Sequence, residues 1–159
     1  MRPDAVKSPR REGVLVLEAF LPYRLSILSN TVSGRIAKSY AERFSLTVPE
    51  WRVMAVLGRF PGLTAGEVTE RTAMDKVQVS RAVASLVAAR RVARTPDDKD
   101  GRVGRLALTR TGMAIYEEIV PLALRLERTF VAALSRDERE ALDQLLSKLT
   151  RQAKTLSAN

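Results

Sequence analysis

The chain of 159 residues contains no cysteine and no histidine. The absence of cysteine excludes disulfides, thiolate nucleophiles and zinc–thiolate sites. Histidine, the commonest general base and metal ligand in proteins, is missing as well. Both absences argue against an enzyme, which would have to work with carboxylates such as Glu117 and Glu118. The sequence therefore predicts no enzymatic activity, no cofactor and no metal site.

Long apolar runs are also missing. No stretch approaches the roughly 18–20 residues that a membrane-spanning helix needs. The apolar run at residues 14–17 is too short for a signal peptide. With 45% hydrophobic and 28% charged residues, the composition is typical of a soluble globular chain. We therefore expect a cytoplasmic protein with no membrane partner.

Acidic residues are scarce in one part of the chain. Residues 74–111 carry nine basic and four acidic side chains, and no aspartate or glutamate lies between Lys76 and Pro96. Residues 112–159 carry seven of each, although the net charge of the whole chain is +9. A generally basic, solubilising surface would not leave the C-terminal third neutral. A localised positive patch is instead typical of a nucleic-acid site.

Apolar residues recur every three or four positions in three stretches, which predicts three long helices. The first starts near Pro22 and ends near Phe44. The second opens at residues 109–112, continues to Phe130 and is expected to bend at Pro121. The third covers residues 136–154. Their apolar stripes indicate burial either against a second copy of the chain or in the core of a monomer.

Capping-box patterns mark four helix starts, because a Ser, Thr or Asp is followed three residues later by Glu or Gln. They begin at Thr47, Thr64, Asp75 and Ser135. Helices are therefore expected to start at about residues 48, 65, 76 and 136. The helix at 65–71 is joined by a few residues to a basic helix at 76–90. This order predicts a helix-turn-helix.

A β-hairpin is expected directly after this helix-turn-helix. Residues 92–94 and 106–108 are short, alternating segments that flank a polar, glycine-containing loop at 95–104. A hairpin in that position is the wing of a winged helix-turn-helix. The fold class is therefore expected to be mainly α with a small β-hairpin wing.

The helix expected over 76–90 has two different faces. One is an apolar stripe formed by Val79, Ala82, Val83 and Leu86. The other carries short side chains and a single arginine, which suits close approach to the DNA major groove. The candidate DNA-binding residues of this helix are Lys76, Val77, Gln78, Ser80, Arg81 and Ala84.

Individual roles follow from side-chain chemistry. Arg81 can pair with guanine and Gln78 with adenine, while Val77 can pack on a thymine methyl group. Lys76, at the start of the helix, is expected to touch phosphate. The alternative is that all of these are ordinary surface residues.

Basic residues of the hairpin are further candidate DNA contacts: Arg94, Lys99, Arg102 and Arg105. Lys99 and Arg102 lie in the loop, where they suit the minor groove or the phosphate backbone. Arg94 and Arg105 lie on the strands, and they either touch phosphate or bridge to the aspartates of the loop. Those aspartates, at positions 97, 98 and 100, are expected to pair with the arginines and fix the shape of the loop.

Three stretches resemble parts of a known family. They read LPYRLSILSNTVSGRIAKSYAERFSLTVPEWRVMAVL, MDKVQVSRAVASL and DDKDGRVGRLALTRTG. In that order they resemble the first helix running into the second, the recognition helix, and the wing signature of the MarR family of winged helix-turn-helix transcriptional regulators. The resemblance implies a homodimer, formed by intertwined N- and C-terminal helices, whose two lobes read a pseudo-palindromic operator. It also implies repression that a small aromatic ligand relieves.

The elements and the resemblance together give a domain scheme. Residues 1–12 are expected to be a disordered basic tail. Residues 13–46 and 112–159 would form a helical dimerisation region, and residues 47–111 the winged helix-turn-helix DNA-binding lobe. Near the junction of the two regions lie the aromatic residues Tyr40, Phe44, Trp51 and Tyr116. They either line a pocket for a planar effector or belong to the core.

The sequence thus predicts a sequence-specific regulator that binds double-stranded DNA, and the resemblance implies that it acts on transcription as a homodimeric repressor. A winged-helix protein-interaction module without DNA binding is the alternative. The basic, acid-free face of the helix at 76–90 argues against that alternative.

Overall fold

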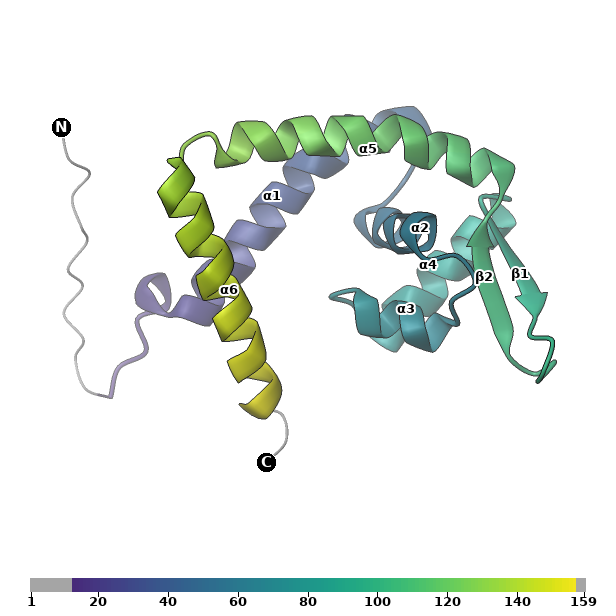
Figure 1. Cartoon of the computed structure of the whole chain (residues 1–159), viewed down its shortest axis with the longest axis horizontal. Helices are drawn as coiled ribbons and strands as arrows, with labels where there is room; N and C mark the ends of the chain where they lie inside the picture. The colour runs from purple at the N-terminus through teal and green to yellow at the C-terminus, as the bar shows by residue number, and fades with distance from the viewer. Residues whose placement is uncertain (1–12, 157–159) are drawn as a thin grey trace. The chain divides into compact units, whose positions relative to one another are not determined.

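The computed structural model describes residues 13–156, and the tail expected over residues 1–12 lies outside the described residues. In chain order the elements are η1 (Leu17–Ala19), α1 (Leu21–Phe44), α2 (Val48–Arg59), α3 (Ala65–Arg71), α4 (Lys76–Ala88), β1 (Val92–Pro96), β2 (Gly104–Leu108), α5 (Arg110–Val131) and α6 (Arg136–Leu156) (Figure 1). A mainly helical fold with one hairpin confirms the expected fold class. The short 3₁₀ helix η1 is an addition that the sequence pattern did not predict.

The chain divides into two compact units, Met1–Tyr116 and Glu117–Asn159. The boundary falls within α5, so the first residues of this helix belong to one unit and the remainder to the other. Pro121 lies inside α5, which continues past it as an α-helix. The division does not test the expected dimerisation region and DNA-binding lobe, which stay predictions.

All four expected capping boxes are present. In three of them the side chain of the N-cap residue, Thr47, Thr64 or Asp75, accepts a hydrogen bond from the backbone N–H three residues later. The Glu or Gln at that later position accepts one in return from the N-cap backbone. Ser135 and Glu138 exchange the same pair of bonds at the start of α6. These reciprocal bonds satisfy two helix N–H groups that would otherwise lack a partner.

The core of the first unit lies between α2, α3, α4 and the hairpin, which gather around one another in Figure 1. Its fully buried apolar side chains are Val53, Met54, Leu57, Val68, Val79, Leu86, Val92 and Leu106. Burying each such side chain stabilises the fold by roughly 1.5–3 kcal/mol. The stripe expected on α4 is confirmed, since all four of its residues are buried.

The hairpin is longer than the sequence predicts. Its antiparallel strands pair from Val92 with Leu108 to Pro96 with Gly104, two residues further on each strand than expected. The extension is possible because Pro96 stands at the end of its strand, where a missing N–H does little harm. Leu63, which precedes α3, also bridges to Leu106 on the other side of β2. This bridge fixes the hairpin to the helix-turn-helix.

Residues 108–112, which read Leu-Thr-Arg-Thr-Gly, join the hairpin to α5 and make a close backbone contact. The Thr109 hydroxyl donates to the carbonyl of Arg90 and accepts from the N–H of Gly112. A Cβ atom on Gly112 would overlap the carbonyl oxygen of Arg91. Only glycine therefore fits at this position. Arg90 itself has a φ of 56°, a left-handed conformation that ends α4.

In the second unit, α6 has no buried residue. Its leucines share one stripe and are all exposed, namely Leu142, Leu145, Leu146 and Leu149. In the first unit, the N-terminal half of α1 exposes a similar set, namely Leu21, Tyr23, Leu25, Ile27 and Leu28. Within residues 13–156, no helix combines the length and apolar character that crossing a bilayer requires.

Candidate DNA interface

The outward face of α4 is built as the sequence indicates. Its candidate residues, Lys76, Val77, Gln78, Ser80, Arg81 and Ala84, are all exposed. Val77 is 57% exposed although it is apolar, whereas Val79, two positions later, is 1% exposed. An exposed valine among short side chains leaves the helix backbone open to close approach. Whether these residues contact DNA stays a prediction.

Gln78 has a structural task besides its expected contact with adenine. Its Oε1 atom accepts a hydrogen bond of 3.1 Å from the backbone N–H of Asp75, and its own N–H donates to the Asp75 carboxylate. A bidentate pair with adenine needs both the oxygen and the NH₂ group of the amide. In this conformation only the NH₂ group is available to a base.

Glu50 links α2 to α4, a connection that the sequence does not reveal. One carboxylate oxygen accepts from the N–H and the hydroxyl of Thr47, and the other accepts from the Ser85 hydroxyl. Burial raises the pKa of Glu50, but the hydrogen bonds from Ser85 and Thr47, helped by the charge of Arg91, outweigh it and hold the pKa below its ordinary value. A charged, buried glutamate thus sets the position of α4 on α2.

The wing loop is folded by two of its aspartates. Oδ1 of Asp97 accepts from the backbone N–H groups of Lys99 and Asp100, and Asp100 accepts from the N–H of Arg102. These are Asx-type turns, in which a side chain replaces a backbone acceptor. The expectation that aspartates shape the loop holds for these two, through backbone groups more than through arginine side chains.

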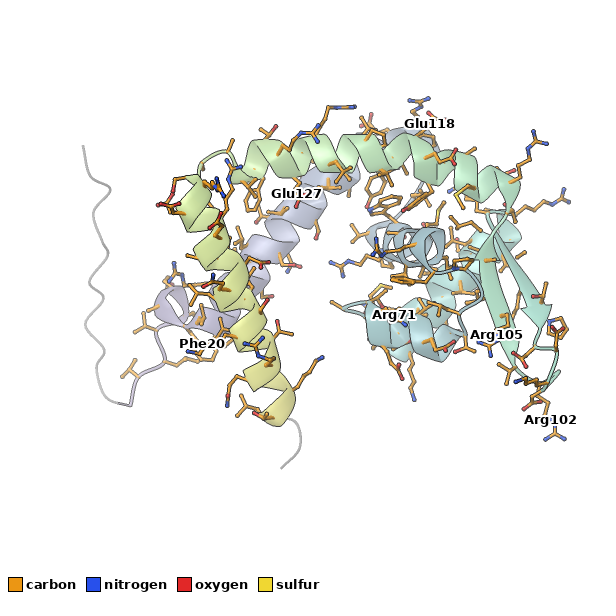
Figure 2. All side chains as sticks on the ribbon, viewed as in Figure 1. Phe20, Arg71, Arg102, Arg105, Glu118 and Glu127 are labelled. Atoms are coloured by element: carbon orange, nitrogen blue, oxygen red, sulfur yellow. The ribbon has the colours of Figure 1, made fainter. Side chains whose placement is uncertain are left out.

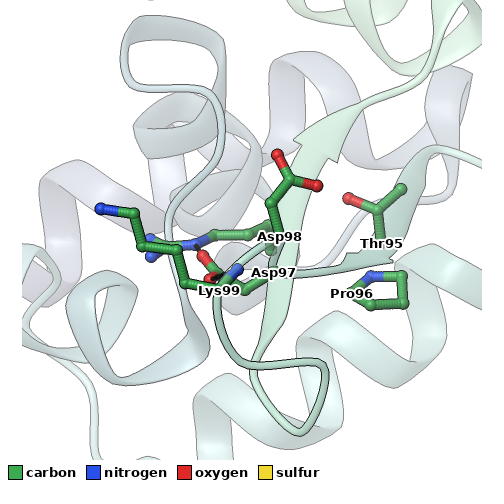
Figure 3. A pocket seen from close by; sticks show the side chains of 6 residues that line it. Thr95, Pro96, Asp97, Asp98 and Lys99 are labelled. Atoms are coloured by element: carbon green, nitrogen blue, oxygen red, sulfur yellow. Dashed lines mark hydrogen bonds and ion pairs between the residues drawn. The ribbon is translucent and has the colours of Figure 1, made fainter.

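The two loop cations lie on the outside of this turn. Lys99 and Arg102 are both exposed. Arg102 extends from the tip of the hairpin away from the helices (Figure 2). The turn beneath them also forms one wall of a shallow pocket whose lining side chains are drawn in Figure 3. Their positive charges are therefore placed where a partner molecule can reach them.

The two strand arginines differ from each other. Arg94 is exposed, and its side chain lies so close against Gly104 that a Cβ added there would overlap the arginine Nε. Arg105 instead donates from Nε to Asp97 over 2.6 Å, and from one terminal nitrogen to Glu67 over 3.3 Å and to the carbonyl of Gly62 over 3.2 Å. Of the two roles left open by the sequence, the contacts of Arg105 match bridging.

Three of the four expected pocket aromatics lie together. The rings of Tyr40 and Trp51 have centroids 5.6 Å apart, and those of Trp51 and Tyr116 are 6.0 Å apart. The fourth aromatic residue, Phe44, contacts a cation: the guanidinium carbon of Arg43 lies over the Phe44 ring, 5.0 Å from the ring centroid. Burial raises the pKa of Tyr40 to about 12, with the charge of Arg52 opposing the shift, so the phenol stays neutral.

A small cavity of about 130 Å³ adjoins these aromatics. It is lined by Ser33, Ile36, Tyr40, Val48, Trp51 and Arg52. Arg52 supplies a full positive charge to this lining, and its guanidinium also reaches the Ser33 hydroxyl at 3.4 Å and the carbonyl of Ala73 at 3.5 Å. Ala73 belongs to the turn between α3 and α4. The cavity thus borders a residue that touches the helix-turn-helix.

Comparison with known proteins agrees with this geometry. Residues 44–103, from the end of α1 through the wing loop, match the model of the MarR family. The HTH-type transcriptional regulator TcaR of Staphylococcus aureus is 24% identical over 130 residues, which are 80% of this chain and 85% of TcaR.

Two solved structures have a similar fold. A mutant of Escherichia coli MarR in complex with operator DNA superposes with a TM-score of 0.74 and 25% identity, covering 86% of this chain and 99% of that one. BpsR of Bordetella bronchiseptica, whose DNA binding is regulated by 6-hydroxynicotinic acid, gives a TM-score of 0.76 and 24% identity over 87% of this chain and 98% of its own. Residues 44–103 thus match the MarR family, and most of the chain has the fold of winged helix-turn-helix transcriptional regulators of that family.

Proposed function

We propose that the protein is a repressor that binds a pseudo-palindromic operator in double-stranded DNA as a homodimer in the cytoplasm. The observation that carries the proposal is the exposed face of α4, which has Lys76 and Arg81 among short side chains and no acidic residue. A helix with this face can enter the major groove without electrostatic or steric conflict.

In this account α4 lies in the major groove and the wing lies against the adjacent minor groove or backbone. Arg81 donates to guanine N7 and O6, and Lys76 contacts a phosphate. Gln78 reads a base through its NH₂ group while its oxygen keeps the cap of α4. Lys99 and Arg102, at the tip of the wing, add contacts that hold the lobe on the duplex.

The homodimer is supported by apolar surface that one chain leaves exposed. The stripe of four leucines on α6 and the apolar residues of the first half of α1 are each in contact with solvent. Contiguous apolar surface of this kind marks an interaction site in soluble proteins. A two-fold axis would present two α4 helices to successive major grooves, about 34–36 Å apart along the DNA.

A small planar aromatic effector that carries an anionic group fits the cavity beside Tyr40 and Trp51. The aromatic rings offer stacking surfaces, and the guanidinium of Arg52 offers a partner for a carboxylate. Such a ligand relieves repression only if it binds the conformation that does not fit the operator more tightly. The contact between Arg52 and Ala73 supplies a physical connection from the cavity to the turn before α4.

The experiment that tests the proposal is selection of bound fragments from genomic DNA of the source organism, with heparin as competitor. We expect the enriched fragments to share a pseudo-palindrome whose half-sites lie one helical turn apart, in or near a promoter. Repression is then read from a reporter gene placed behind that sequence, with and without the protein. Enrichment of no sequence over random fragments, or increased reporter expression with the protein present, would contradict the proposal.

A further inference from the structure

The side chain of Arg105 joins two parts of the lobe that are distant in the sequence. From β2 it reaches Asp97, at the base of the wing loop, over 2.6 Å. The same guanidinium reaches Glu67, in the first turn of α3, over 3.3 Å, and the carbonyl oxygen of Gly62 over 3.2 Å. Figure 2 places Arg105 between the hairpin and α3. One residue thus connects the wing to the helix-turn-helix.

Each partner of Arg105 has a second task. The Asp97 oxygen that does not bind Arg105 accepts the backbone N–H groups of Lys99 and Asp100, which shape the wing loop. The Glu67 oxygen that binds Arg105 also accepts the N–H of Thr64, which caps α3. The position of the loop is therefore coupled, through a single guanidinium, to the start of α3.

The charges in this cluster do not suit a contact with phosphate. Arg105 has two carboxylates as partners. Hydrogen bonds with Thr64 are the main cause that lowers the pKa of Glu67, and the charges of Arg105 and then Arg71 lower it further. Two arginines and two carboxylates leave the cluster without net positive charge. A phosphate would therefore be attracted only after Arg105 had given up its bond to Asp97, a short hydrogen bond between two charged groups.

We propose that Arg105 is a positioning residue for DNA binding, which holds the wing loop at a fixed place relative to α3 so that Lys99 and Arg102 meet the duplex. The proposal rests on the proposed DNA-binding function. It assigns to Arg105 an indirect role, through Asp97 and Glu67, in place of the direct phosphate contact that its position on the wing suggests. Without the interactions of Arg105, the wing loop would no longer be held in place, and Lys99 and Arg102 would lose their contacts with the duplex.

Replacing Asp97 by asparagine separates the two roles because they predict opposite signs. The amide oxygen of the new side chain could still accept the two loop N–H groups, but the charged bond to Arg105 would be lost. If Arg105 positions the wing, Asp97→Asn weakens operator binding by about tenfold, the size expected for one or two lost backbone contacts. If Arg105 contacts phosphate, the substitution frees it and removes a negative charge, so that binding becomes tighter.

Asp98→Asn is the matched control. It makes the same change of charge at the next residue of the same loop, and the carboxylate of Asp98 points away from that of Asp97 (Figure 3). We expect operator binding by this variant to be unchanged or slightly tighter. Glu67→Gln is a second probe, since its amide oxygen can keep the cap on Thr64 while the charge facing Arg105 is lost. It should weaken binding in the same direction as Asp97→Asn.

A double-mutant cycle tests whether Arg105 acts through the tip of the wing. Arg105→Gln alone should weaken operator binding about tenfold, but should add little when Arg102 and Lys99 have both been replaced by alanine. Independent, multiplying losses would mean that Arg105 touches the DNA itself and would overturn the proposal. Thermal melting of each variant identifies any loss that comes from unfolding, and a variant that has unfolded at the assay temperature is replaced by Arg105→Lys.

Failure of this inference differs from failure of the proposed function. If the unmodified protein binds no DNA at low salt, the proposed function is wrong and the wing has no such role. If the unmodified protein binds its operator while Asp97→Asn binds as tightly or more tightly, the proposed function stands and the positioning role of Arg105 is wrong.

Discussion

The hydroxyl of Ser85 donates a hydrogen bond to the carboxylate of Glu50, and this bond ties α4 to the first turn of α2. The two residues are 35 positions apart in the sequence. Glu50 is 9% exposed, so its carboxylate depends on these protein donors in place of water. The bond therefore bears on stability and on the placement of α4.

Removing this hydroxyl should destabilise the protein. We expect Ser85→Ala to lower the free energy of unfolding by about 1 kcal/mol or somewhat more, because a charged acceptor is left with one donor fewer. Ser80→Ala, on the exposed face of the same helix, should change it by less than about 0.5 kcal/mol. Denaturant unfolding of both variants checks the difference, and equal stabilities would show that the bond to Glu50 does not matter.

The charge of Glu50 should make stability depend on pH. The pKa of Glu50 is lower in the folded protein than its ordinary value of 4.5. Its contribution is therefore complete above pH 4.5 and is lost as the pH falls through the folded pKa. We expect Glu50→Gln to be less stable than the unmodified protein at neutral pH, with the gap closing in acid. A gap that stays constant from about pH 7 to about pH 3 would contradict this.

Alanine substitutions at Gly112 and Gly34 should have opposite effects on the stability of the protein. Gly112→Ala should destabilise the protein by about 1–3 kcal/mol, since the added methyl meets the backbone carbonyl of Arg91. Gly34→Ala, inside α1 with no atom near its added Cβ, should stabilise by about 0.5–1 kcal/mol. Thermal melting of the two variants compares them. A stable Gly112→Ala variant would mean that α5 begins differently.

Substitutions at the two parts of the interface should have different effects on sequence preference. Arg81→Ala should relax discrimination at one position of each half-site, at a cost of about 1–3 kcal/mol. Lys99→Ala should weaken binding to all DNA sequences alike, and the negative slope of log K against log salt should become shallower by about 0.9. Binding to a panel of single-base operator variants separates the two. Equal losses of both proteins on operator and random DNA would refute this division.

A charge in the leucine stripe of α6 should prevent assembly. Leu145 is 57% exposed in the single chain, and Leu145→Glu would place a carboxylate in the interface that we propose. We expect this variant to sediment as a single chain at concentrations where the unmodified protein is a dimer. Gln144→Glu, an exposed polar position on the opposite face of the same helix, is the control and should remain dimeric.

Local patterns account for what the sequence predicts well. The helix starts at Thr47, Thr64 and Asp75 were correct because a capping box involves residues only three positions apart. The buried stripe of α4 was also correct, since it depends only on helical periodicity. The order of the elements, two closely joined helices followed by a hairpin, predicted a winged helix-turn-helix, and the family resemblance added the expected homodimer and operator.

Contacts between residues that are far apart in the chain could not be predicted from the sequence patterns. The pairing of Leu63 with Leu106 and the bond from Arg105 to Glu67 join segments that are far apart in the chain, and neither leaves a periodic signal. The engagement of Gln78 in its own cap was visible in principle, because the capping-box pattern includes it. Because the Oε1 atom of Gln78 accepts the hydrogen bond of the helix cap, only its NH₂ group is available to contact a base.

The most direct measurement is sedimentation velocity of the protein with a labelled duplex that carries the selected operator, repeated at several salt concentrations. The account predicts a complex of two chains per duplex, with log K falling linearly as log salt rises. A protein that remains a single chain at every concentration, or that leaves the duplex unbound at low ionic strength, would contradict it.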